Sequence, residues 1–354
     1  MNYDRWIARW EGEGGAVPEV VRARRRRAVE AAKTIKLRTI LVPIDFSPAS
    51  LKTLRYAELL GKRFKADLHL VHVLDAPLVA ARQPSLLSFA KEVAGNAKKR
   101  LAELAAKSSL PSRPTRYTVR TGNIPDEISR LAGVTNAGLI VIATRGFTGL
   151  KRAFVGSTTE RVVRTAPCPV FIFREKQRPK ARQRARGGQP PLQFGKILVP
   201  VDFSQNSRLG VEYGLRFARE FGASVVLFHS VFVTPFVLGN EYTAREVPNL
   251  IQIQQDYAEE EMQKLRKQVS EKGMEVETEI AFGSPVEQIN EYVRREDVDL
   301  IVTSTHGRSG LERLFIGSTA ERIVRYAPTP VLVVPNRVAE KNPKSKKRPS
   351  HPQP

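Results

Sequence analysis

The stretch that decides the fold is ILVPIDFS at residues 40–47, because it recurs as ILVPVDFS at residues 197–204. Two further pairs follow in the same order: GFTGL (146–150) with GRSGL (307–311), and APCPV (166–170) with APTPV (327–331). The first pair is shifted by 157 positions and the later pairs by 161, so the copies differ in length near their middle. So many collinear matches indicate a tandem duplication of one unit.

Within a unit, continuously apolar runs alternate with amphipathic stretches. In the first unit we expect strands at 39–44, 67–73, 116–121, 138–143 and 169–173, and helices at 48–64, 86–107, 124–134 and 157–165. Ser47 followed by Pro48 is a typical N-cap and first helical residue. Strands without alternation are expected to be buried on both faces, and the β-α-β order predicts a mostly parallel sheet covered by helices. The second unit repeats this pattern near 196–335.

Length and composition restrict the class of protein. The 354 residues suffice for two domains with their own cores, and 41% hydrophobic residues is typical of a globular chain. No apolar run approaches the roughly 18 residues of a membrane helix. Residues 1–15 lack the apolar core of a signal peptide, and Cys168 alone excludes an intrachain disulfide, so we expect a reducing, cytoplasmic location.

The net charge of +22 is unevenly distributed along the chain. We expect five segments: a basic N-terminal arm (1–36), a first domain (37–174), a basic linker (175–194), a second domain (195–336) and a basic disordered tail (337–354). Residues 39–173 carry a formal charge of +11, whereas residues 197–334 carry −6. The arm, linker and tail could therefore touch nucleic acid or another anionic surface weakly.

Two sets of residues stand where an open parallel sheet binds ligands, beyond the carboxyl ends of its strands. Asp45 and Asp202 end the first strand of each unit, and glycine-containing loops at 144–156 and 305–317 lead from the fourth strand into a helix. Glycines allow close approach to a phosphate, and the helix N-terminus offers unpaired N–H groups.

The same residues also have purely structural interpretations. Ser157 with Glu160, and Ser318 with Glu321, have the spacing of capping boxes that need no ligand. Asp45 could equally form a turn before the helix cap. His72 and His229, which end apolar strands, are expected to be hydrogen-bonded structural residues rather than catalytic bases.

Together, the ILVPxDFS starts, the Gly-x9-Gly-Ser-Thr loops and the Ala-Pro-x-Pro-Val strands resemble universal stress protein domains, over about residues 37–174 and 195–336. The resemblance implies, in each copy, an open five-stranded parallel sheet of order 3-2-1-4-5 with helices on both faces, an adenine nucleotide alpha hydrolase-like fold. It also implies binding of ATP or AMP, which Mg²⁺ can accompany, in a stress-response protein that senses or interacts rather than catalyses rapidly.

The nucleotide-binding residues follow from the same resemblance. In the first domain they are Pro43, Asp45, Val73, Ala143, Gly146, Gly156, Ser157 and Thr158; in the second they are Pro200, Asp202, Ser230, Ser304, Gly307, Gly317, Ser318 and Thr319. ATP-binding members carry Gly-x2-Gly-x9-Gly-Ser/Thr, and here Ala143 and Ser304 replace the first glycine. The residues suggest no catalytic group, and the five histidines and one cysteine form no cluster with metal-ligand spacing.

Two other functions are compatible with the sequence. One is a weak ATP hydrolase or phosphoryl-transfer enzyme, although no Walker lysine is present. The other is a nucleotide-free scaffold that acts through its basic tails. In either case the short apolar strands at 169–173 and 330–334 offer edges through which the two copies could pair within one chain, and a further homodimer could form.

Overall fold

The computed structural model describes residue 35 and residues 37–75, 84–108, 114–144, 156–174, 193–232, 246–305 and 317–336. The chain divides into two compact units after Ile35, and the elements below all belong to the second unit. The expected basic arm, most of the linker and the tail lie outside the described residues, as do Gly146 and Gly307.

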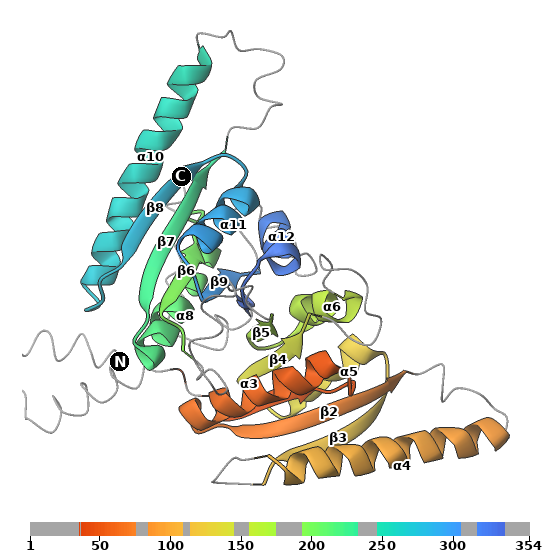
Figure 1. Ribbon diagram of the computed structural model, residues 1–354. Coiled ribbons are helices and arrows are strands. Elements are labelled where there is room, and N and C mark those ends of the chain that lie inside the picture. Colours follow the sequence, from red (N-terminus) through yellow and green to blue (C-terminus); the bar gives the residue numbers. More distant parts are fainter. Residues whose placement is uncertain are drawn as a thin grey trace, which may run out of the picture. The chain divides into compact units, whose positions relative to one another are not determined.

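The first domain alternates strands and helices along the chain (Figure 1). Its elements are β1 (Thr39–Pro43), α3 (Pro48–Phe64), β2 (Asp67–Asp75), α4 (Pro84–Ala106), β3 (Arg116–Gly122), α5 (Ile124–Val134), β4 (Leu139–Ala143), α6 (Ser157–Thr165) and β5 (Val170–Phe173). The predicted α/β alternation is confirmed, and the Ser47 hydroxyl caps α3 by accepting the N–H of Ser50 at 3.2 Å.

The second domain repeats the order of the first. Its elements are β6 (Lys196–Pro200), α8 (Gln205–Phe221), β7 (Ser224–Val231), α10 (Glu246–Ser270), β8 (Glu277–Phe282), α11 (Pro285–Arg295), β9 (Leu300–Ser304), α12 (Ser318–Tyr326) and β10 (Val331–Val334). Helix α10, at 25 residues, is longer than α4, at 23 residues.

The strands follow the order β3-β2-β1-β4-β5-β10-β9-β6-β7-β8. Each half has the predicted order 3-2-1-4-5, and all its pairs are parallel. Instead of two separate sheets, one continuous sheet forms, because β5 and β10 are antiparallel neighbours with Phe171 opposite Leu332. Both strands are apolar and fully buried. If β5 and β10 were not paired with each other, their backbone N–H and C=O groups on that side would lack hydrogen-bond partners.

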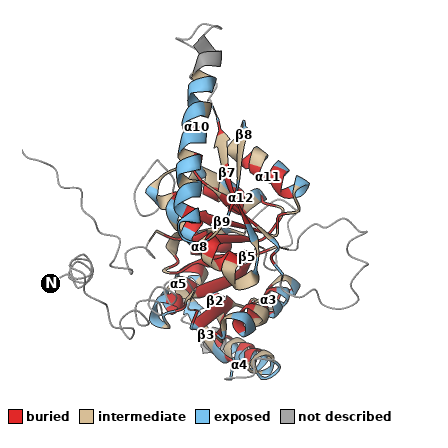
Figure 2. Cartoon of the chain, turned by 90° about the vertical axis from the view of Figure 1, so that its left-hand side faces the viewer, coloured by how far each residue is buried: buried red, intermediate tan, exposed pale blue. Residues whose placement is uncertain are grey.

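The core is continuous across the two domains. One cluster joins side chains of α5, α6, α11 and α12 to one face of the sheet, while α3, α4, α8 and α10 pack on the other face. Figure 2 shows buried residues gathered on the inner strands and exposed residues along α10. The carboxyl ends of the parallel strands in each domain therefore lie at one edge of a rigid, buried platform.

Candidate functional site

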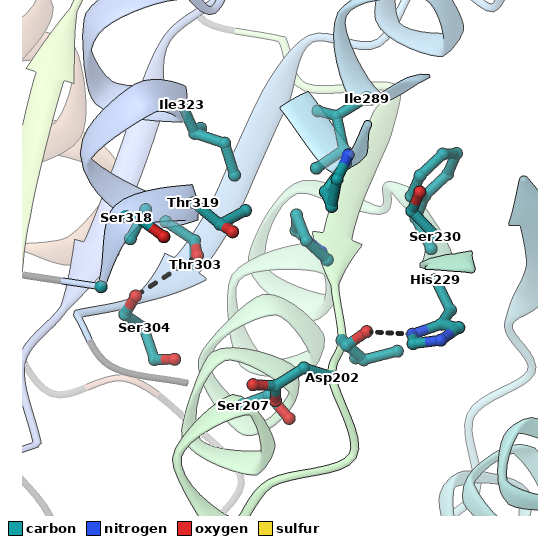
Figure 3. A pocket seen from close by; sticks show the side chains of 16 residues that line it. Asp202, Ser207, His229, Ser230, Ile289, Thr303, Ser304, Ser318, Thr319 and Ile323 are labelled. Atoms are coloured by element: carbon teal, nitrogen blue, oxygen red, sulfur yellow. Dashed lines mark hydrogen bonds between the residues drawn. The ribbon is translucent and has the colours of Figure 1, made fainter. Parts of the chain in front are cut away.

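A cavity of about 320 Å³ lies at the carboxyl ends of the strands of the second domain. Its lining comes from the ends of β6, β7 and β9 and from α8, α11 and α12: Pro200, Val201, Asp202, Ser207, Phe228, His229, Ser230, Pro285, Ile289, Thr303, Ser304, Gly317, Ser318, Thr319, Ala320 and Ile323. Figure 3 shows Ser304, Ser318 and Thr319 on one side of the cavity and His229 and Ser230 on the other. Its volume lies at the lower end of the range of small-molecule sites.

The cavity brings together every predicted residue of the second domain that the structure describes. These are Pro200, Asp202, Ser230, Ser304, Gly317, Ser318 and Thr319. In the first domain, Pro43, Val73 and Ala143 occupy the matching strand positions, with Asp45 after β1 and Gly156, Ser157 and Thr158 at the start of α6. The duplicated motifs therefore converge on equivalent places in both copies.

Asp202 forms a turn that directs the chain from β6 into α8. Its Oδ1 atom accepts the Ser204 N–H at 3.0 Å and the Ser204 hydroxyl at 2.6 Å. Phe203, between them, has a φ of 64°, which is unusual for a bulky residue and needs support from its surroundings. The first domain repeats this turn, since Asp45 Oδ1 accepts the Ser47 N–H at 2.9 Å. The turn-forming role of these aspartates is therefore real, and it holds Asp202 at the cavity wall.

His229 supports this turn from the neighbouring strand. Its Nδ1 atom lies 2.8 Å from the Val201 carbonyl oxygen and therefore donates its hydrogen, and its ring packs 4.5 Å from the Phe203 ring. His72 makes the same contact with the Ile44 carbonyl at 2.7 Å. Nδ1 is thus occupied in both histidines, as expected of structural residues.

The capping-box interpretation of the starts of α6 and α12 is wrong. Gly156 and Gly317, not the serines, are the N-caps of α6 and α12, and neither helix start has a side-chain cap. Each glycine N–H donates to the residue after the preceding strand, Thr144 at 2.9 Å or Thr305 at 2.8 Å, which fixes the helix start one residue earlier. Gly317 has no side chain with which to cap the first turn of α12, and this helix start adjoins the cavity.

The two copies differ where the first glycine of the loop pattern is replaced. In the first domain the Thr159 hydroxyl donates to the Ala143 carbonyl at 2.8 Å. In the second, Ala320 holds the matching position, and the Ser304 carbonyl accepts a longer contact of 3.4 Å from the Thr303 hydroxyl. The Ser230 hydroxyl turns toward the adjacent loop and donates to the Gly283 carbonyl at 2.7 Å.

Several lining residues were not anticipated from the sequence. Ser207, Pro285, Ile289, Thr303 and Ile323 contribute to the wall, mostly from helix faces that pack on the sheet. Nothing in their spacing distinguishes them from core residues, so only the mutual placement of helices and strands reveals them.

In the part of the chain that the structure describes, no group of three or more His, Cys, Asp or Glu side chains could hold a metal ion, and no helix is both long and apolar enough to cross a bilayer. A metal ion held by protein side chains alone therefore has no candidate position in this part of the chain.

Comparisons with known proteins agree with the duplicated architecture. The profile of the universal stress protein family matches residues 36–174 and 193–335. Universal stress protein MJ0531 of Methanocaldococcus jannaschii is 36% identical over 142 residues, which cover 40% of this chain and 82% of that protein. Universal stress protein YxiE of Bacillus subtilis is 28% identical over 148 residues, which cover 40% of this chain and 99% of that protein.

Among solved structures, a universal stress protein from Archaeoglobus fulgidus superposes with a TM-score of 0.60 at 20% identity, covering 84% of this chain and 98% of that one. One from Pseudomonas aeruginosa gives a TM-score of 0.55 at 20% identity and covers 88% of this chain. At these identities the likeness concerns the fold alone, which is of the adenine nucleotide alpha hydrolase-like type.

Proposed function

Since the chain belongs to the universal stress protein family, we propose that it binds an adenine nucleotide in the cavity of its second domain. The observation that carries the proposal is the convergence of Asp202, Ser230, Ser304 and the start of α12 on one cavity. These residues come from three strand ends and one helix, and they are the ones that the loop pattern and strand ends single out.

The α12 end of the cavity suits the phosphates. The N–H groups of the first turn carry the positive end of the helix dipole, and the N-cap residue, Gly317, has no side chain to cap them. Gly317 presents no side chain at the point where the phosphate would approach, and the hydroxyls of Ser318 and Thr319 can donate to phosphate oxygens.

The β6–β7 side suits the base and the sugar. The Asp202 carboxylate can accept a hydrogen bond from the exocyclic amino group of adenine, and the backbone at Ser230 can form hydrogen bonds with the edge of the adenine ring. Pro200 and Ser304 lie where the ribose would pack. Phe228, Ile289 and Ile323 supply apolar surface. A volume of about 320 Å³ suits the nucleoside and its first phosphate. Gly307, which lies outside the described residues, is proposed from the sequence pattern alone.

Binding, rather than rapid turnover, is the favoured activity. The His229 Nδ1 atom is already engaged by the Val201 carbonyl, and no described cluster could hold a catalytic metal on its own. Mg²⁺ therefore enters only as a companion of the nucleotide phosphates. Occupancy would tie α12 to β6 and β9, and it would in this way change the surface offered to partners in the stress response.

The equivalent site of the first domain provides a matched control. Gly317→Val and Gly156→Val place the same side chain at the same position of each copy, and the backbone at both glycines (φ −56° and −63°) accepts any residue. Titration calorimetry with ATP and AMP should show binding to the wild type and to G156V. Binding to G317V should be weaker by at least about tenfold, the equivalent of about 1.4 kcal/mol.

Thermal unfolding gives a second readout, because a nucleotide at about 100 times its Kd stabilises the folded state by about 2.7 kcal/mol. A wild type that neither binds nor is stabilised by adenine nucleotides would refute the proposal. Loss of binding in G156V alone would move the site to the first domain.

A further inference from the structure

Among the described residues, the two outermost strands of the sheet, β3 and β8, have no neighbouring strand on one side. Every residue of the inner strands β4 and β9 is buried, whereas no residue of β3 or β8 is. Tyr117 is 38% exposed and Phe282 48% exposed at these edges. Free strand edges carry unpaired N–H and C=O groups and can pair with another strand.

The two edges carry opposite charge. Strand β3, RYTVRTG, contains Arg116 and Arg120 and no acidic residue, whereas β8, ETEIAF, contains Glu277 and Glu279 and no basic residue. Arg120 forms no ion pair within the described part of the chain, while Glu279 contacts Arg295 at 3.2 Å and remains 36% exposed. The difference follows the overall charges of the two domains, +11 over residues 39–173 and −6 over residues 197–334.

Titrating groups beside each edge respond to these charges. Burial, followed by the charges of Arg116 and Arg120, lowers the pKa of His69 on β2. Burial, followed by the charge of Glu279 and of two neighbouring glutamates, raises the pKa of Tyr292 on α11 to about 12. The field is thus positive at the β3 edge and negative at the β8 edge.

We propose that β3 of one copy of the chain pairs with β8 of a second copy in antiparallel fashion, so that copies associate head to tail. One register, with Tyr117 opposite Phe282, suits both faces of the sheet. Three of the pairs that it forms are complementary: Tyr117 with Phe282, Val119 with Ile280, and Arg120 with Glu279. Aromatic, β-branched and opposite-charge pairs of this kind stabilise antiparallel strands.

The geometry of the sheet permits this register. Thr118 is in register with Val71, and Glu279 with Phe228, and both core residues lie under the helix layer formed by α5, α6, α11 and α12. Arg120, two residues beyond Thr118, therefore projects from the same face of the sheet as Glu279. An antiparallel junction that keeps this face, as β5 and β10 do within the chain, brings the two charges together.

Charge also decides against the symmetric alternatives. Pairing β3 with β3 would set arginines against arginines, and pairing β8 with β8 would set glutamates against glutamates, which is unfavourable across strands. A β3–β8 contact is heterologous and leaves one edge of each sign free at the ends, so it continues into longer assemblies.

The test is sedimentation velocity of the full chain over a concentration series at low salt. The average mass of the wild type should rise with concentration and fall when NaCl is added. Arg120→Glu should raise the dissociation constant of assembly about tenfold, because attraction becomes repulsion across one strand pair. Arg55→Glu, which makes the same charge change at an exposed position of α3, should leave the mass series unchanged.

A charge swap separates pairing from damage to the fold. Glu279→Arg alone should also weaken assembly, but an equimolar mixture of R120E and E279R chains should assemble again, since each variant then offers the edge that the other requires. Circular dichroism and unfolding curves check that each variant is folded. A wild type that keeps the mass of one chain throughout, or a mixture that assembles no better than its components, would overturn the proposal.

Discussion

Arg174 is the residue through which the first domain holds a helix of the second. It follows β5, and its guanidinium donates to the carbonyls of Ala327 at 2.6 Å and Arg325 at 2.9 Å, and also to that of Val324. These carbonyls belong to the last turn and C-cap of α12, where they have no partner within the helix and carry the negative end of the helix dipole. Arg174→Ala removes all three interactions in one step.

The expected cost follows from the type of contact. A hydrogen bond to a charged group contributes about 1.5–3 kcal/mol, and a cation at a helix C-terminus about 0.3–1 kcal/mol. The three bonds share one guanidinium, and after the substitution water can reach the half-buried carbonyls, so their contributions do not add in full. We therefore expect R174A to lower the free energy of unfolding by about 2 kcal/mol.

Urea unfolding followed by circular dichroism measures this loss, and hydrogen exchange locates it. Amides of α12 should exchange faster in R174A, although the substituted residue belongs to the other domain. Arg161→Ala is the control, because Arg161 makes only an exposed pair with Asp126 at 3.5 Å, worth about 0–1 kcal/mol. If R174A unfolds like the wild type and α12 exchanges at the same rate, Arg174 does not hold α12.

Two further substitutions test the interior of each domain. Burial, then Arg116 and Arg120, lowers the pKa of His69 below its ordinary 6.5, so the unfolded chain binds more protons and stability should fall as pH drops below about 6.5. His69→Val should make the unfolding free energy less dependent on pH between about 7 and 5, and an unchanged pH slope would contradict this reasoning. Gly214→Ala should destabilise the second domain by about 1–3 kcal/mol in urea unfolding, because the new Cβ would lie 2.6 Å from a Val199 methyl; a neutral result would mean that β6 moves aside easily.

The secondary structure could be predicted closely because burial dictates it. The helix expected at 48–64 and the one at 124–134 have those bounds, and the strand expected at 138–143 begins one residue later, at Leu139. In these elements the residue types agree with the positions that they occupy. Strand β4 is apolar throughout and wholly buried, and α3 begins with Ser47 as its N-cap and Pro48 as its first helical residue.

The helix expected at 157–165 has those bounds, but the capping-box interpretation of its start, and of the start of α12, is wrong for a physical reason. Ser157 with Glu160 has the spacing of a capping box, but the same spacing arises when the serine is the first helical residue and the N-cap is the glycine before it. The choice is made by a backbone hydrogen bond from Gly156 to Thr144, across a loop whose ends meet only in the folded sheet. The sequence therefore allowed both a helix start open to an anion and a start capped by its own side chains, and the spacing alone could not choose between them.

Duplication also explains why the two copies need not share a function. The scaffold of each copy relies on the same turn, in which Asp45 or Asp202 holds the helix start and a histidine holds the strand end. Once β5 and β10 pair, however, each copy has its own outer edge and its own set of strand ends, and no symmetry requires these to match. A substitution in one copy, such as Ala320 where the other has Thr159, then changes the contacts at one strand end while the sheet that supports both copies remains intact. The opposite charges of β3 and β8 are another such difference between the two domains. Two outer edges of like charge would repel each other when two chains meet, whereas edges of opposite charge attract.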